Sequence, residues 1–141
     1  MSQRFLVPID GSVHSTKAVE TAIELIQSLR QKPFVTLLHV NHTPPIIDNY
    51  DVNIDIEEVV KREGQKILRP ASERLKAMGI RFEAISLKGE PVNQICALAK
   101  KGDYDMVIMG SRGLGRVSEL VLGSVSRQVI QHVQCPVLIT K

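Results

Sequence analysis

Glycines and serines in the C-terminal third of the chain have the spacing that points most clearly to chemistry. Gly110-x2-Gly113 follows an apolar run, and Gly123-Ser124 comes after a further nine-residue insert, just ahead of a helical pattern. Glycine has no Cβ, so its backbone N–H groups can approach a phosphate closely. A helix N-terminus adds unpaired N–H groups and a dipole that favours an anion, and the hydroxyls of Ser124 and Ser126 add donors. This spacing predicts two phosphate-binding elements.

Each of these residues also has a simpler interpretation. Glycines are common in turns, and Ser124 can be an ordinary N-cap of the helix that follows it. Asp10, which ends the first apolar run, is either a ligand-binding residue or a cap of the next helix. Taken singly, these residues do not separate the two interpretations, and the argument for a site rests on their joint spacing.

Apolar runs alternate with helical patterns along the chain, which predicts an α/β fold. Buried strands are expected at residues 5–9, 34–40 and 105–109. A strand near a sheet edge is expected at 81–87, and an apolar final strand at a sheet edge at 136–140. Helices are expected over the apolar stripes at 18–29, 55–78, 90–99 and 125–133, with a loop at 41–53. Ser12 or Ser15 is expected to cap the first helix. Pro70 is expected to kink or break the second, and Gly79 to end it.

These elements predict a five-stranded, parallel, doubly wound sheet in the order 3-2-1-4-5. Helices cover both faces, in a Rossmann-like single domain over residues 1–141. In such sheets, ligands bind beyond the carboxyl ends of the strands, where the strand order reverses. The crevice is therefore expected between the first and fourth strands. Pro8, Asp10 and Gly11 are expected on one lip, and Met109, Gly110 and Gly113 on the other.

Composition excludes several classes of protein. Apolar residues make up 43% of the 141 residues and charged residues 23%, which is typical of a globular domain. The net charge of +3 attracts phosphate weakly and does not indicate a specific nucleic-acid partner. No segment has the length of a signal peptide or a membrane span, so no membrane association is expected and the expected location is the cytoplasm.

Other candidate groups lack a functional pattern. Cys96 and Cys135 are expected to be buried apolar residues, without a disulfide framework or metal spacing. The histidines show no ligand spacing, and His39 is expected to be structural because it lies in a buried strand. Gly110-x4-Gly115-Arg116-Val117 has the frame of a P-loop, but Arg replaces the required Lys and Val replaces the Ser or Thr.

The whole chain resembles the universal stress protein family. Four segments carry the resemblance in the right order: Val-Pro-Ile-Asp-Gly-Ser at the first strand, Leu-Leu-His-Val at the second, Val-Ile-Met-Gly-Ser-Arg-Gly at the fourth, and Cys-Pro-Val-Leu-Ile-Thr at the fifth. The Gly-x2-Gly-x9-Gly-Ser spacing is similar to that of the ATP-binding members of the family.

This resemblance implies roles for particular residues. Pro8, Asp10 and Val40 should surround the nucleoside, with main-chain groups near Val40 meeting the adenine. The ribose and phosphates should be held by Met109, Gly110, Arg112, Gly113, Gly123, Ser124, Val125 and Ser126. The resemblance also implies ATP with Mg or Mn, the metal being carried by the phosphates rather than by assigned side chains. It further implies a homodimer joined through the last strand, and protein partners that the sequence does not identify.

Two functions are compatible with such a site. The first is a nucleotide-dependent switch or interaction module in a stress response, with little or no hydrolysis. The alternative is a slow, Mg- or Mn-dependent ATP hydrolase. Phosphoryl transfer needs a metal and a group that orients the attacking water. The acidic residue nearest to Gly123 is Glu119, which is expected to face solvent. The sequence therefore favours binding over efficient hydrolysis and leaves open whether the protein is an enzyme.

Overall fold

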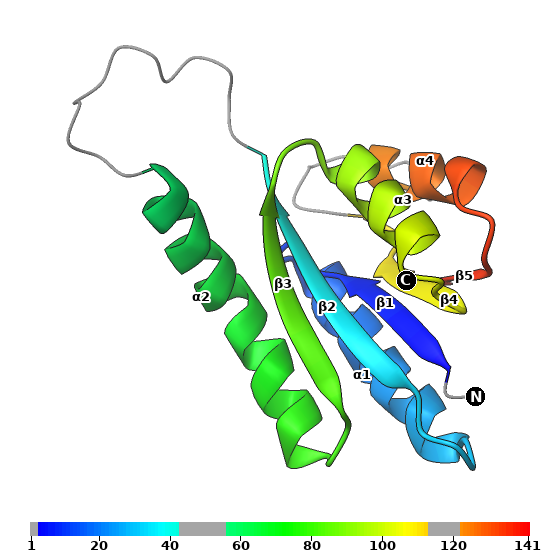
Figure 1. The fold of residues 1–141 in the computed structure, drawn as a ribbon. Coiled ribbons are helices and arrows are strands. Elements are labelled where there is room, and N and C mark those ends of the chain that lie inside the picture. The colour runs from blue at the N-terminus through cyan, green and yellow to red at the C-terminus, as the bar shows by residue number, and fades with distance from the viewer. Residues whose placement is uncertain (1–2, 43–55, 113–121) are drawn as a thin grey trace.

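Short parallel strands form one sheet, with β1 (Arg4–Pro8) at its centre (Figure 1). The computed structural model describes residues 3–42, 56–112 and 122–141. The sheet has five strands in the order β3-β2-β1-β4-β5, and all neighbouring pairs are parallel. This confirms the predicted strand order. The other strands are β2 (Phe34–Asn41), β3 (Phe82–Lys88), β4 (Met106–Gly110) and β5 (Val137–Thr140).

Helices cover both faces of this sheet, as predicted (Figure 1). On one face lie α1 (Val13–Ser28) and α2 (Ile56–Ala77), and on the other lie α3 (Pro91–Lys101) and α4 (Ser124–His132). Each connection between consecutive strands thus contains one helix that packs on a face of the sheet, as in other doubly wound folds. Within the described residues, no helix is both long enough and apolar enough to cross a membrane.

Two apolar layers hold the helices to the sheet. Successive side chains of a strand point to opposite faces, so Val7 and Leu6 enter different layers although they are neighbours in sequence. In the first layer Val7 and Leu37 pack with Ile26 of α1. In the second, Leu6 joins a cluster that includes Leu38, Ile95, Met109 and Val129. The central strands are buried on both faces, which explains their nearly continuous apolar sequences.

The helix α2 passes through Pro70 without interruption, so the predicted break at this proline is wrong. Proline removes one intrahelical hydrogen bond, but α2 is anchored on the core by Leu68, Ala71 and Leu75 on both sides of it. The end predicted at Gly79 is confirmed: the N–H of Gly79 donates to Lys76 O, and that of Ile80 donates to Leu75 O. Gly79 has a φ of +70°, as this type of helix end requires.

The central strand β1 stops pairing with both neighbours at its carboxyl end. Its register with β2 ends at Pro8 opposite Leu38, and its register with β4 ends at Leu6 opposite Val107. The N–H of Asp105 donates to Arg4 O, so alternate residues of β1, including Pro8, direct their backbone groups toward β4. Proline has no N–H to donate, so the pairing with β4 does not continue. The two strands therefore separate at the carboxyl edge of the sheet.

A glycine at the end of β4 brings this edge close to α1. A Cβ built on Gly110 would lie 2.7 Å from the backbone carbonyl carbon and oxygen of His14. Such a contact is too short for real atoms, and the atoms it meets are backbone that cannot rotate away. Gly110 was expected to make room for a phosphate, which stays a prediction; the structure gives it a further role, which is to admit the first turn of α1.

We predict that Gly110→Ala lowers the free energy of unfolding by about 1–3 kcal/mol, because overpacking against a backbone forces β4 and α1 apart. Urea denaturation followed by circular dichroism measures this change. Gly79→Ala provides the comparison, since no atom lies within 4 Å of a Cβ built there and only its positive φ opposes the change. Equal unfolding midpoints for Gly110→Ala and the unmodified protein would contradict the packing argument.

Candidate functional site

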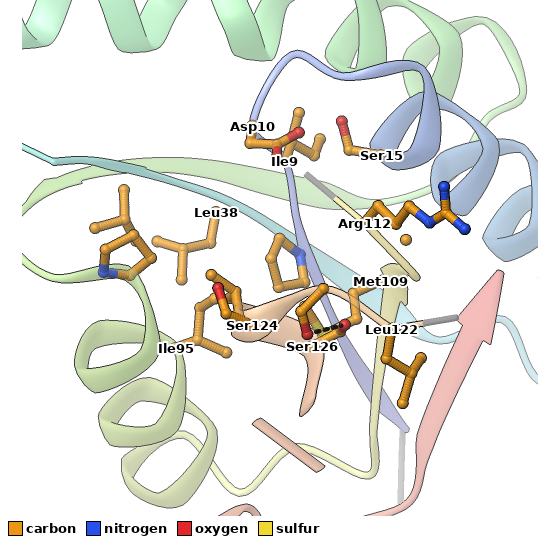
Figure 2. Close-up of a pocket in the computed structure, with 16 residues that line it drawn as sticks. Ile9, Asp10, Ser15, Leu38, Ile95, Met109, Arg112, Leu122, Ser124 and Ser126 are labelled. Carbon is orange, nitrogen blue, oxygen red and sulfur yellow. Dashed lines mark hydrogen bonds between the residues drawn. The ribbon is translucent and has the colours of Figure 1, made fainter. Parts of the chain in front are cut away.

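A pocket lies at the carboxyl edge of the sheet, where β1 and β4 separate (Figure 2). Its volume is about 340 Å³, within the range of small-molecule sites. Residues from β1, β2, β4, α3 and the start of α4 contribute to it. The lining residues are Pro8, Ile9, Asp10, Ser15, Leu38, Val40, Pro91, Ile95, Met109, Gly110, Arg112, Leu122, Gly123, Ser124, Val125 and Ser126.

The structure brings the residues predicted for a site together around this pocket. Pro8 lines it from the end of β1, Asp10 from the turn that follows, and Val40 from β2. Met109, Gly110 and Arg112 line it from β4 and the segment after it. The remaining lining residues that were predicted are Gly123, Ser124, Val125 and Ser126 at the start of α4. Gly113 lies outside the described residues, as does Glu119. The structure thus places these residues around one pocket. Their roles toward a ligand stay predictions.

The N-terminus of α4 differs from those of α1 and α3 in having no side-chain cap. Ser12 caps α1, its Oγ accepting from Ser15 N at 3.1 Å, and the Glu90 carboxylate caps α3 by accepting from Asn93 N at 2.9 Å. The N-cap of α4 is Gly123, which has no side chain to offer. The first N–H groups of a helix have no partner within it. The start of α4 therefore presents backbone donors and the positive end of a helix dipole to the pocket.

Ser111 fixes the position of this helix start. Its carbonyl oxygen accepts from Gly123 N at 2.6 Å and from the hydroxyl of Ser126 at 2.9 Å, while its own N–H donates to Thr140 O at 2.8 Å. Ser126 is 2% exposed and its single proton is directed to backbone carbonyls. The hydroxyl of Ser126 therefore holds α4 against the end of β4, while its predicted role as a donor to phosphate stays a prediction.

Asp10 shapes the turn between β1 and α1 but is not the cap of that helix. Its Oδ1 accepts from Ser12 N at 2.9 Å, and Ser12 is the residue whose side chain caps α1. Of the three capping residues proposed from sequence, Ser12 is therefore the right one, and Ser15 follows within the helix. The turn needs a positive φ at Gly11, which is +86°. Asp10 is thereby held at the rim of the pocket.

The apolar end of the pocket contains residues that sequence reasoning did not assign to a site. Leu38 and Ile95 lie at this end in Figure 2, and Pro91 also lines the pocket from α3. Arg112 lies away from them, beside the first turn of α1. Two features of the sequence could have indicated these residues. Leu38 precedes Val40 by two residues and so lies on the same face of β2. Pro91 and Ile95 belong to α3, the helix that precedes β4 in the chain.

The described residues outside the pocket offer little further chemistry. Among them, no group of three or more His, Cys, Asp or Glu side chains is placed to hold a metal ion. His39 is buried, with its Nδ1 2.9 Å from Ile9 O, which confirms its expected burial. Cys96 and Cys135 are unpaired and half-buried rather than fully buried, and both pack beside the second apolar layer.

Fold and pocket together define a class of protein. A doubly wound parallel sheet with a pocket at the switch point, an apolar end and an uncapped helix N-terminus is the arrangement of small α/β domains that bind ligands at this edge. A model of the universal stress protein family matches residues 1–141. The chain belongs to the universal stress protein family.

Relatives of known sequence agree with this assignment over the full length of the chain. Universal stress protein YxiE of Bacillus subtilis is 35% identical over 150 aligned residues, which cover 100% of both chains. Universal stress protein MJ0531 of Methanocaldococcus jannaschii is 29% identical and the alignment covers 99% of this chain and 82% of that protein.

Solved structures share the fold. The protein MJ0577 superposes with a TM-score of 0.87 at 26% identity, covering 100% of this chain and 96% of that one. A universal stress protein solved in complex with cAMP has a TM-score of 0.70 at 28% identity and covers 99% of this chain and 97% of that one. An Arabidopsis thaliana family member with AMP bound has a TM-score of 0.72 at 24% identity, covering 99% of this chain and 91% of that one.

The surroundings of the two cysteines predict low reactivity. Burial raises the pKa of the Cys96 thiol, and the Glu90 carboxylate raises it further. Burial is also the main cause that raises the pKa of Cys135, with Asp105 adding to it. Since the thiolate is the nucleophile, we predict alkylation by iodoacetamide at pH 7.5 to be slower than for free cysteine, and to accelerate only as the pH rises beyond the ordinary thiol range. Mass spectrometry of each site measures the rates; rapid labelling at pH 7.5 would contradict this.

Proposed function

We propose that this protein binds ATP in the pocket between β1 and β4 and acts as a nucleotide-dependent interaction module. The observation that carries the proposal is the uncapped start of α4 at a pocket that also has apolar lining residues. Phosphates fit against the helix start, because backbone N–H groups and a helix dipole favour anions. A nucleobase fits against the apolar lining, between Leu38, Val40 and Ile95. The related proteins solved with cAMP and AMP support a nucleotide as the ligand class.

Within this proposal the polar residues divide the ligand between them. Arg112 and the N–H groups of Ser124 and Val125 contact the phosphates, together with Gly113 of the predicted spacing. Asp10, at the rim beside Pro8, accepts from ribose hydroxyls. Met109 and Gly110 form the floor between the phosphate and base positions.

The proposed module binds the nucleotide with little or no hydrolysis. Efficient phosphoryl transfer needs a metal and a positioned water. Asp10 is the carboxylate among the lining residues, and its Oδ1 already accepts from Ser12 N. The described residues contain no cluster of acidic, His or Cys side chains for a metal. Mg or Mn would therefore be held by the phosphate oxygens, whose charge it would offset, rather than by a protein cage.

We predict that Gly123→Val weakens ATP binding about 10- to 100-fold, because the branched side chain covers N–H groups whose hydrogen bonds to a charged ligand are worth about 1.5–3 kcal/mol. Isothermal titration calorimetry with ATP and Mg measures the change. Adenosine is the control ligand, since it lacks phosphates and its affinity should be nearly unchanged. Full ATP affinity in the variant would show that α4 does not bind the phosphates. No ATP binding by the unmodified protein would contradict the proposed function.

A homodimer joined through β5 is the second part of the proposal. β5 is at one end of the sheet order, so one of its edges has no neighbouring strand among the described residues. The Ser111 N–H donates to Thr140 O and the Val107 N–H donates to Pro136 O, so even-numbered residues of β5 face β4. Val137 and Ile139 then direct their N–H and C=O groups outward. A second copy related by two-fold symmetry would pair them.

We predict that Ile139→Pro raises the dimer dissociation constant at least about tenfold, because each copy loses one outward N–H while the bonds to β4 remain. Sedimentation velocity over a concentration series measures association. Val59→Lys is the control: it removes an exposed apolar side chain from α2, far along the sheet order from β5. A monomeric unmodified protein at micromolar concentration would exclude this dimer.

A further inference from the structure

The backbone of Val40 is free to contact a ligand because β1 ends early beside it. In β2, the even-numbered residues direct their backbone groups toward β1: Phe34 N donates to Gln3 O, and Leu38 O accepts from Ile9 N at 2.7 Å. Val40 continues this alternation. A regular ladder would join Val40 N to Ile9 O, but no such bond is present among the described residues. The N–H and C=O of Val40 therefore face the pocket that Val40 lines.

The oxygen that Val40 would need in a regular ladder accepts a hydrogen bond from a side chain instead. Nδ1 of His39 lies 2.9 Å from Ile9 O, and a carbonyl oxygen can only accept, so Nδ1 carries the proton and donates it. The side chain of His39 leaves β2 on the face opposite to that of Val40, because neighbouring residues of a strand alternate. The imidazole thus reaches Ile9 O from the α2 side of the sheet, while Val40 faces the pocket on the other.

Close packing holds this imidazole in place. His39 is 6% exposed. A Cβ built on Gly64 of α2 would lie 3.8 Å from its Cδ2 and 2.0 Å from Oγ of Ser86. The absence of a side chain at Gly64 therefore lets α2 approach β3 and close over Ser86 and the ring. A side chain fixed in this way has little freedom to release Ile9 O.

We propose that His39 is a positioning residue for nucleobase recognition. By donating to Ile9 O it ends the pairing of β1 with β2 and keeps the N–H and C=O of Val40 available to a base. The inference rests on the proposed function for the identity of the ligand, but the freedom of the Val40 backbone can be measured without any ligand. An adjacent N–H and C=O offer one donor and one acceptor, which matches the N7 and N6–H₂ edge of adenine, whereas the N7 and O6 edge of guanine presents two acceptors.

The test compares His39→Leu with His39→Asn. Leucine fills the space without a donor, whereas the Nδ2 of asparagine occupies nearly the position of Nδ1 in histidine and can donate to Ile9 O. Hydrogen exchange by NMR, without nucleotide, reports on Val40. In His39→Leu we expect the Val40 amide to exchange at least about tenfold more slowly than in the unmodified protein, because it now donates to Ile9 O. In His39→Asn we expect exchange as fast as in the unmodified protein.

Affinities for ATP, GTP and inorganic tripolyphosphate complete the experiment. In His39→Leu we expect the preference for ATP over GTP to approach one, with tripolyphosphate affinity unchanged; His39→Asn should keep the preference. Unchanged Val40 exchange in a folded His39→Leu would overturn the proposal, and so would an equal loss of all three affinities. If the unmodified protein binds no nucleotide but the exchange rates change as expected, the control of Val40 by His39 stands and the proposed function fails.

Discussion

The early end of β1 is the constraint on which the rest of the site depends. A central strand normally has hydrogen-bonded neighbours along its whole length, and this one loses both at its carboxyl end. Pro8 has no N–H for β4, and the carbonyl of Ile9 accepts from the ring of His39 rather than from the next N–H of β2. The strands beside β1 continue past it, so a space opens at this edge of the sheet.

Capping then determines which end of this space can receive negative charge. Helices α1 and α3 both start near the pocket, but Ser12 and Glu90 already satisfy N–H groups at their first turns. The start of α4 has only Gly123, and Ser111 holds that residue by the backbone. The electrostatic preference of the pocket is therefore set by one missing side chain and by the bonds that keep the bare helix end in position.

Much of the fold could be predicted from the sequence because the signals were local and strong. Continuous apolar runs marked the buried strands, and Gly79 and Pro91 marked a helix end and a helix start. The site was predictable only in part. Its strand ends and glycines follow from topology, but the wall formed by Ile95 depends on how α3 packs against the sheet. Sequence alone also could not show that Gly110 admits α1, or that a buried histidine bonds to a carbonyl on the next strand.

The close approach of Gly110 to His14 means that the pocket has two kinds of position: those where a substitution disturbs the packing of the fold, and those where it changes only the lining. A side chain at Gly110 would push against the backbone of α1, so drift at this position carries a structural penalty whatever the ligand. Ile95 and Leu122 line the same pocket with apolar side chains, which make none of the hydrogen bonds described for the site. Divergence in ligand preference can therefore accumulate at Ile95 and Leu122 while the floor at Gly110 stays constant, so that one scaffold can serve descendants with different small molecules.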